Sequence, residues 1–389
     1  MFVLFTIAAA SRNVELIYIV SYSVPLFYLF FIFSGYEEVI NNKELRFVIA
    51  LVSLFGVWAM ITSLWSWYPR VSFTRSTVFI ISSWSVITAG FLWAKYYNKN
   101  ILAYLIPLNI LNLLISFFSL WTKIPHDYWA GYGYGLKSFW GHQNTLALAI
   151  IFTLPGIFYL PVKDKRFKIT LVSILFALNV YILILTHSRT CLVLLILSAI
   201  LFALLTRQYK ITGGVVLALL FLGIICFANK NAGDRVYNYI FKTENTLLDR
   251  KKPVFEASYM AAENGGFIGL GYGLSDNSVL GNLHVIEHYH IESGRLVREK
   301  GVSLFALKEE TGWVGLALFL LFLGTIFLMA VKTYLRNRDN TSALIVCVLT
   351  GMYIHAQFEG WMTGIASLPL PLLFVLTGII IYFYSVKDL

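Results

Sequence analysis

The chain has few charged residues. They make up 13% of its 389 residues, against about 25% in an average soluble protein. Hydrophobic residues reach 58% instead. One aqueous core cannot hide that much apolar surface, so lipid must be the solvent for most of the chain. The composition excludes an ordinary soluble protein and predicts an all-α integral membrane protein.

Cysteine is scarce too. Cys191, Cys226 and Cys347 each lie in an apolar segment, without the spacing of a zinc site or a disulfide framework. The histidines between His284 and His290 stand close to Glu287, but their spacing matches no common metal-binding pattern. We therefore expect no metal and no cofactor.

Basic residues outnumber acidic ones and give a net charge of +10. Such an excess can indicate a nucleic-acid partner. Here the excess lies mostly in short loops between apolar runs, where membrane topology explains it better. We expect no nucleic-acid partner.

Apolar runs long enough to cross a bilayer, about 17–25 residues, recur along the chain. Eleven are predicted, at 15–34, 46–67, 73–94, 101–121, 145–161, 169–186, 189–206, 211–228, 312–332, 342–359 and 364–386. Residues 1–11 form a short twelfth candidate. We expect about twelve transmembrane helices.

Basic residues in short loops set the orientation, because they collect on the cytoplasmic side. Alternating the sides places fourteen on one face: Lys43, Arg46, Lys95, Lys99, Lys163, Lys165, Arg166, Lys168, Arg207, Lys210, Lys332, Arg336, Arg338 and Lys387. The opposite short loops hold Arg12, Arg70, Arg75, Lys123, Lys137 and Arg189. The first face is predicted to be cytoplasmic, with both termini there.

One outer loop, residues 229–311, is unusually long and carries eleven acidic and ten basic side chains. Long loops between packed elements are uncommon unless they are functional. The chain therefore divides into helices over 1–228, this loop, and three helices over 312–389. Within the loop we expect an amphipathic helix over Asn245–Met260 and a turn-rich stretch over Gly265–Gly273.

Arg189 begins a predicted span at its outward end. A cation opposes the helix dipole there, whereas an anion is stabilised. An arginine beside helix-terminal N–H groups would make a strong phosphate or diphosphate site. The alternative is an arginine whose charge extends to the membrane interface.

Other outer residues could bind a polar head group. Arg250 stands in a run of three cations, which suits a polyanion or a solvated helix face. His142 precedes a span and could bind a head group or cap the helix, and Asn144 is a candidate N-cap.

The large loop ends with Arg298-Glu299-Lys300-Gly301 and then Glu309-Glu310-Thr311-Gly312. A carboxylate close to the membrane could take a proton from a sugar hydroxyl. For Glu309 and Glu310, an ion-paired loop entering a helix is an equally good interpretation.

Taken in order, these segments resemble the O-antigen ligase/polymerase superfamily of bacterial membrane glycosyltransferases. The matching segments are Phe139-Trp140-Gly141-His142-Gln143-Asn144, Ser188-Arg189-Thr190, Arg250 with Gly269-Leu270-Gly271-Tyr272-Gly273, and Glu310-Thr311-Gly312-Trp313-Val314-Gly315-Leu316. Their order, spacing and shared outward sidedness carry the resemblance, which covers roughly residues 100–330.

The resemblance implies a GT-C-like fold in the bacterial inner membrane, with the large loop in the periplasm. It implies an undecaprenyl-diphosphate-linked oligosaccharide as donor, metal-independent transfer, and a chain-length regulator as protein partner. Arg189 and Arg250 would hold the diphosphate and Glu299 would be the base. The expected substrate-binding residues also include His142, Asn144, Arg298 and Lys300.

Ligase members of the superfamily carry a His-Asn pair shortly before the Glu-Thr-Gly motif, where this chain has Gly301-Val302. Its Glu-Lys-Gly-x-Ser pattern resembles the polymerase-like exopolysaccharide branch. We therefore expect a polymerase that joins lipid-linked repeat units. The alternatives are a ligase acting on a lipid A-core or protein acceptor, and a transporter of a small solute. Transport favours charges within spans, whereas charges here gather in outer loops.

Overall fold

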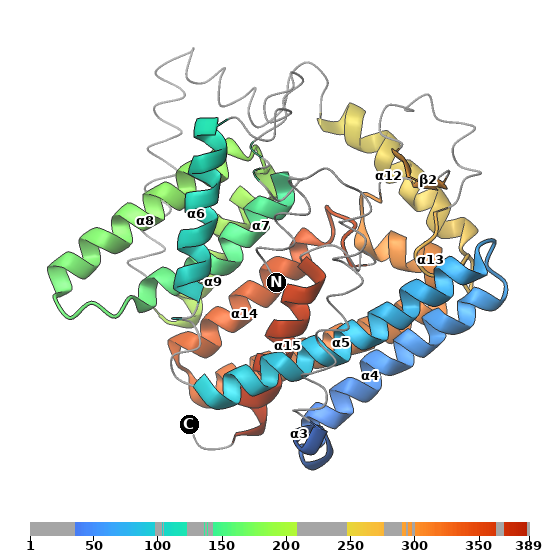
Figure 1. Ribbon diagram of the computed structural model, residues 1–389, viewed down its shortest axis with the longest axis horizontal. Helices are drawn as coiled ribbons and strands as arrows, with labels where there is room; N and C mark the ends of the chain where they lie inside the picture. Colours follow the sequence, from blue (N-terminus) through green and yellow to red (C-terminus); the bar gives the residue numbers. More distant parts are fainter. Residues whose placement is uncertain are drawn as a thin grey trace. The chain divides into compact units, whose positions relative to one another are not determined.

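The computed structural model describes residues 36–97, 103, 105–122, 136, 138, 143–207, 247–275, 290–292, 295–297, 300–362 and 369–386. Within these ranges the long elements are helices, and a short antiparallel hairpin joins β1 (His290–Glu292) to β2 (Arg295–Val297) (Figure 1). The predicted spans 1–11, 15–34 and 211–228 lie outside the described residues.

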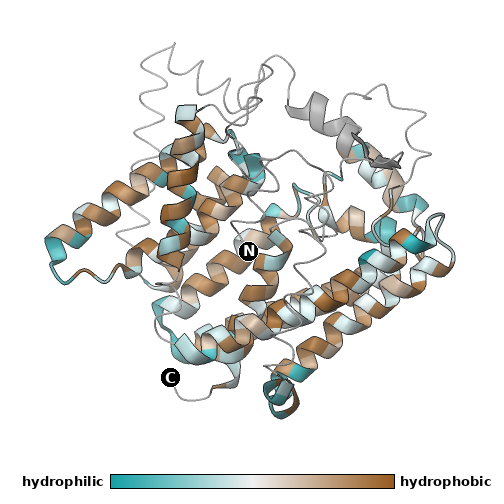
Figure 2. Cartoon of the chain, viewed as in Figure 1, coloured by the Kyte–Doolittle hydropathy of each residue, from teal (hydrophilic) through white to brown (hydrophobic). Residues whose placement is uncertain are grey.

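Five helices are long and apolar enough to cross a membrane: α4 (Lys43–Ile61) continued by the 3-10 helix η1 (Thr62–Leu64), α5 (Pro69–Tyr97), α6 (Leu105–Thr122), α8 (Lys165–Leu185) and α13 (Ser303–Asn337). Shorter apolar helices are α7 (Gln143–Thr153) with the 3-10 helix η5 (Leu154–Tyr159), α9 (Arg189–Leu205), α14 (Asn340–His355) and α15 (Pro369–Ser385). Apolar residues line these helices, and polar residues gather near several helix ends (Figure 2). The prediction of a helical membrane protein is confirmed at this level.

Local sequence explains where several helices begin. The side chain of Asn42 accepts a hydrogen bond from the Leu45 amide at 2.7 Å and so caps α4, which follows the short helix α3 (Tyr36–Asn41). Asp164 caps α8 by accepting from the Arg166 amide at 2.8 Å. A proline opens α5 and another opens α15, where its missing N–H costs nothing.

The large loop contains more helix than its polarity suggests. The expected amphipathic helix is present as α12 (Leu247–Asn264). Helix α13 begins at Ser303, nine residues before the predicted span at 312, so the charged end of the loop is helical. A further difference concerns the span 145–161, which is a short α-helix followed by a 3-10 helix.

The chain divides into two units. Unit 1 contains Met1–Val24, Trp93–Thr243 and Arg338–Gly351, and unit 2 contains Pro25–Leu92, Glu244–Asn337 and Met352–Leu389. Both units combine segments that are distant in the sequence. The division 1–228, 229–311 and 312–389 concerned topology and stays a prediction.

Unit 2 packs around α13, which contacts α4, α12 and α15. Its centre is a group of buried aromatic rings that meet mostly edge to face: Phe55, Phe79, Tyr272, Phe319, Phe322 and Phe374. Helices α5 and α15 cross closely, and two glycines make the close crossing possible. A Cβ at Gly90 would overlap the Val375 backbone, and one at Gly378 would overlap the Ile87 backbone.

Unit 1 packs α6, α7, α8 and α9 around two apolar clusters, one of which contains Leu113, Leu146 and Ile182. A polar network lies inside this unit. Asn109 and Asn179 exchange two amide hydrogen bonds, at 2.9 and 3.0 Å, and Asn109 also donates to Thr153. These contacts join α6, α7 and α8 at buried polar positions.

Candidate functional site

Helix α13 is broken at Gly312, whose backbone angles (φ 68°, ψ −172°) belong to a region that is essentially reserved for glycine. The break takes the preceding carbonyls out of the helical ladder, and donors from two other segments replace the lost partners. The Leu270 amide donates to Glu309 O (3.0 Å), the Gly271 amide donates to Glu310 O (3.0 Å), and Trp58 Nε1 donates to Thr311 O (2.8 Å).

The turn-rich stretch Gly265–Gly273 fits into this break. A Cβ at Gly269 would overlap the Glu310 carbonyl, and one at Gly312 would overlap the backbone of Phe267. The Val314 amide, just past the break, donates to the Phe267 carbonyl at 3.3 Å. Two segments that carry the family resemblance, Gly269–Gly273 and Glu310–Leu316, are therefore in direct contact.

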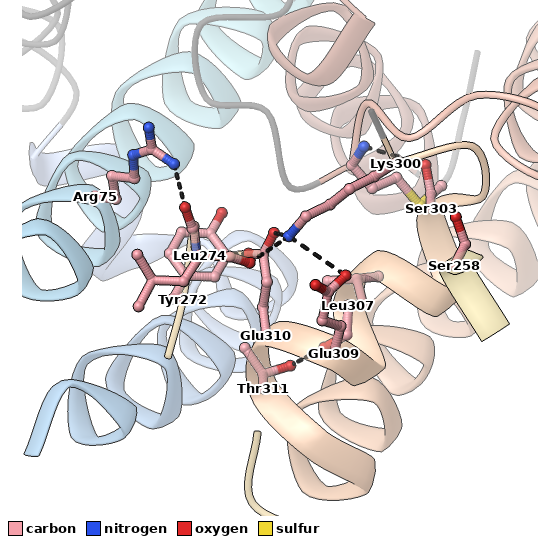
Figure 3. A network of polar contacts seen from close by, with 12 residues as sticks. Arg75, Ser258, Tyr272, Leu274, Lys300, Ser303, Leu307, Glu309, Glu310 and Thr311 are labelled. Atoms are coloured by element: carbon pink, nitrogen blue, oxygen red, sulfur yellow. Dashed lines mark hydrogen bonds and ion pairs between the residues drawn. The ribbon is translucent and has the colours of Figure 1, made fainter. Parts of the chain in front are cut away.

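A buried ionic cluster lies beside the break (Figure 3). The ammonium of Lys300 forms an ion pair with Glu310, lies 3.7 Å from Glu309, and donates to the Leu274 carbonyl at 2.5 Å. Both carboxylates are buried. Lys300 thus holds two acidic residues of α13 and the end of the glycine-rich stretch together.

Glu310 bridges further into the same cluster. Its second carboxylate oxygen accepts from the Gly273 amide at 2.6 Å, while Arg75 of α5 donates to the Gly273 carbonyl. The adjacent Tyr272 is fully buried, and its amide donates to Thr62 Oγ1 at 3.1 Å. Burial, reinforced by the negative charge of Glu310 and partly offset by Arg75, raises the pKa of the Tyr272 hydroxyl well above its ordinary value.

The backbone around Lys300 is also held in place. A Cβ at Gly360 would overlap the Lys300 carbonyl, so the chain after α14 lies directly against it. The Ser303 amide donates to the Ala356 carbonyl at 2.9 Å, and the Ser303 hydroxyl donates to Glu359 O at 2.6 Å. Lys300 and Ser303 are therefore held against the segment that follows α14.

In unit 1, Arg189 is the first residue of α9, as predicted from the sequence. A turn of three residues, Thr186 to Ser188, separates it from α8. In this turn His187 has a positive φ of 53°, and the Ser188 amide donates to Thr186 Oγ1 at 3.2 Å. Both terminal nitrogens of the Arg189 guanidinium are buried, although the residue as a whole is partly exposed. A fixed cation therefore stands at the N-terminus of an apolar helix.

The other predicted site residues have different outcomes. Asn144 is the second residue of α7, so the prediction that it caps this helix is wrong, because the helix begins one residue earlier at Gln143. Arg250 lies near the start of α12. His142, Arg298 and Glu299 lie outside the described residues, so their roles stay predictions.

Sequence reasoning did not assign Arg75, Thr62 or Tyr272 to the site. Arg75 could have been noticed as an isolated charge near the outer end of a span. Tyr272 lies within the segment Gly269–Gly273 that the resemblance includes, whereas Thr62 gives no comparable signal. Among the described residues, no group of three or more His, Cys, Asp or Glu side chains is placed to hold a metal ion.

No protein-family model and no curated protein matches the chain.

Proposed function

We propose that the protein is a polysaccharide polymerase of the bacterial inner membrane. It would transfer an undecaprenyl-diphosphate-linked glycan onto a sugar hydroxyl of another lipid-linked repeat unit. The observation that carries this proposal is Arg189, a cation with buried terminal nitrogens at the first position of an apolar helix. Helix-terminal N–H groups and a guanidinium together suit a diphosphate attached to a membrane lipid.

The proposed reaction needs no redox partner. An acceptor hydroxyl oxygen attacks the anomeric carbon, the bond from that carbon to the diphosphate oxygen breaks, and polyprenyl diphosphate leaves. A base takes the hydroxyl proton, and Glu299 is our candidate. Because the leaving group gathers negative charge, fixed cations supply most of the catalysis, and removing one such donor typically costs about 10²–10³ in rate.

The remaining assignments belong to the same proposal. By the resemblance, Arg250 would also bind diphosphate, and His142, Asn144, Arg298 and Lys300 would bind substrate. Lys300 is engaged by Glu310, so it would act on substrate as part of that buried ion-paired cluster. The fold would be GT-C-like with about twelve spans, a periplasmic loop over 229–311, cytoplasmic termini, and a chain-length regulator as partner.

Transport of a small solute is the main competing function, and the broken helix α13 is a specific observation in its favour. Discontinuous helices in transporters often offer freed backbone carbonyls to an ion or solute. Here the carbonyls of Glu309, Glu310 and Thr311 already accept hydrogen bonds from the protein. The break therefore favours a structural joint over a transport site.

Deletion of the gene, followed by gel analysis of surface glycans and lipid-linked intermediates, tests the function. A polymerase mutant accumulates single repeat units. Full-length polymer stranded on the polyprenyl carrier would indicate the ligase instead, and unchanged glycans would overturn both functions.

Complementation with point variants tests the site. Arg189→Ala should abolish polymerisation, and Arg189→Lys should recover little, since a lysine lacks the planar fork that binds two phosphate oxygens. Arg207→Ala is the matched control, because Arg207 is an exposed cation just beyond the other end of α9. Membrane levels of all variants are compared by immunoblot. Wild-type polymer from Arg189→Ala would refute the site.

A further inference from the structure

Ser188 occupies the N-cap position of α9 but does not cap the helix. Its backbone has the extended conformation typical of an N-cap (φ −85°, ψ 92°), yet its side chain makes no capping hydrogen bond. Ser188 is 2% exposed, and within the described residues its hydroxyl has no hydrogen-bond partner. A buried hydroxyl at a helix start is thus left unused.

Two other N-caps in the chain show the usual arrangement. Asn42 Oδ1 accepts from the Leu45 amide at 2.7 Å, and Asp164 Oδ1 accepts from the amides of Arg166 and Phe167. An N-cap side chain normally satisfies one of the amides that the first helical turn leaves without a partner. At Ser188 that function is absent, so the hydroxyl is available to something else.

The surroundings of Ser188 select an anion. The helix dipole makes this end of α9 positive, and the next residue adds the guanidinium of Arg189 with both terminal nitrogens buried. The turn is held from within, because Thr186 Oγ1 accepts from the Ser188 amide and donates to the Leu183 carbonyl at 2.7 Å. A hydroxyl donor beside two positive features suits a phosphate oxygen.

We propose that Ser188 is a phosphate ligand, and that its hydroxyl and the Arg189 guanidinium together bind one phosphate group of a diphosphate at the N-terminus of α9. This inference deepens the proposed function, since it rests on a diphosphate being the group that Arg189 binds. The Ser188 hydroxyl would be a neutral hydrogen-bond donor that orients the phosphate, whereas the Arg189 guanidinium supplies positive charge.

The test measures binding of inorganic pyrophosphate to the purified full-length protein in detergent, by calorimetry, together with the unfolding temperature without ligand. Wild type is expected to bind. Ser188→Ala should weaken binding about tenfold to a hundredfold, as expected for one hydrogen bond to a charged group. Because no cap is lost, its unfolding temperature should match that of wild type. Ser188→Thr, which keeps the hydroxyl, should retain binding.

Asp164→Ala is the matched control, since it removes a cap that is made, in the same unit. It should lower the unfolding temperature and leave pyrophosphate affinity unchanged. The proposal is overturned if wild type does not bind pyrophosphate, if Ser188→Ala binds as wild type does, or if a water molecule fills the site in an experimental structure grown with pyrophosphate.

Failure of the proposed function gives a different result. Ser188-dependent pyrophosphate binding in a protein that transfers no glycan would refute the polymerase and leave the anion site standing. Normal glycan transfer by Ser188→Ala would refute the ligand role alone.

Discussion

The ammonium of Lys300 and the carboxylate of Glu310 form a buried ion pair at the start of α13, with side chains 10% and 2% exposed. Removing one partner leaves an uncompensated charge inside the protein. We expect Lys300→Met to lower the free energy of unfolding by about 3–5 kcal/mol. Unfolding of the purified protein by SDS titration in mixed micelles measures the change.

A double variant separates the charge from the shape of this pair. Lys300→Met with Glu310→Gln should recover part of the loss, because neither charge of this pair remains, while the buried Glu309 still lacks the neighbouring ammonium. Lys332→Met, at an exposed position of the same helix, should change stability by less than about 0.5 kcal/mol. Equal stability of Lys300→Met and wild type would contradict the buried pair.

Gly312 is expected to tolerate no side chain. Its backbone conformation costs other residues about 1–3 kcal/mol, and overlap with the Phe267 carbonyl adds to this cost. Gly312→Ala should therefore lower the unfolding temperature. Gly324→Ala is the control in the same helix, because a Cβ there meets nothing within 4 Å. Alanine at that helical position should be neutral or stabilising by up to about 1 kcal/mol, and similar behaviour of the two variants would count against the break.

Tyr272 should confer sensitivity to alkaline pH. Burial raises its pKa in the folded state, so its contribution to stability is complete below the unfolded value of about 10 and is lost as pH rises through the folded value. The unfolding temperature of Tyr272→Phe should fall less steeply than that of wild type above about pH 10.

Tyr259→Phe is the control for this pH series, since Tyr259 is half exposed on α12. It should keep the alkaline sensitivity of wild type. Parallel curves for wild type and Tyr272→Phe would show that Tyr272 does not cause the sensitivity.

The reciprocal amide pair of Asn109 and Asn179 predicts a measurable coupling between α6 and α8. Hydrogen bonds between membrane helices contribute about 0.6 kcal/mol on average and up to about 1.7. A double-mutant cycle with Asn109→Leu and Asn179→Leu should give a coupling in this range. As a control, Asn109→Leu combined with Thr325→Val, a partly exposed position in unit 2, should be additive within about 0.5 kcal/mol. If Asn109→Leu and Asn179→Leu are additive to the same degree, the two amides are not coupled.

Hydrophobic runs located most of the described helices, because lipid-facing residues must be apolar along a whole span. The start of α9 at Arg189 was predicted to the residue. The start of α13 was not, since Lys308, Glu309 and Glu310 read as a loop. Each of these charges has a partner in the fold. Lys308 pairs with Glu263 of α12 and lies 4.4 Å from the Trp313 ring, and Glu310 pairs with Lys300, which precedes the helix.

The candidate site was only partly accessible to sequence reasoning. Arg189 was identified because its position at a helix start is a local property. Gly269 packs against the Glu310 carbonyl next to Gly312, which has a positive φ. No local sequence pattern predicts that backbone angle. The sequence likewise does not show that the Ser188 hydroxyl makes no capping hydrogen bond, since a serine before a helix ordinarily indicates a cap.

The break in α13 has a consequence for biosynthesis. Trp58, Leu270 and Gly271, which supply the replacement hydrogen bonds, all precede Gly312 in the chain. A ribosome therefore completes every donor before it adds the residue that interrupts the helix. The carbonyls freed by the break therefore have their hydrogen-bond donors already synthesised. These hydrogen bonds can form as the nascent chain enters the bilayer.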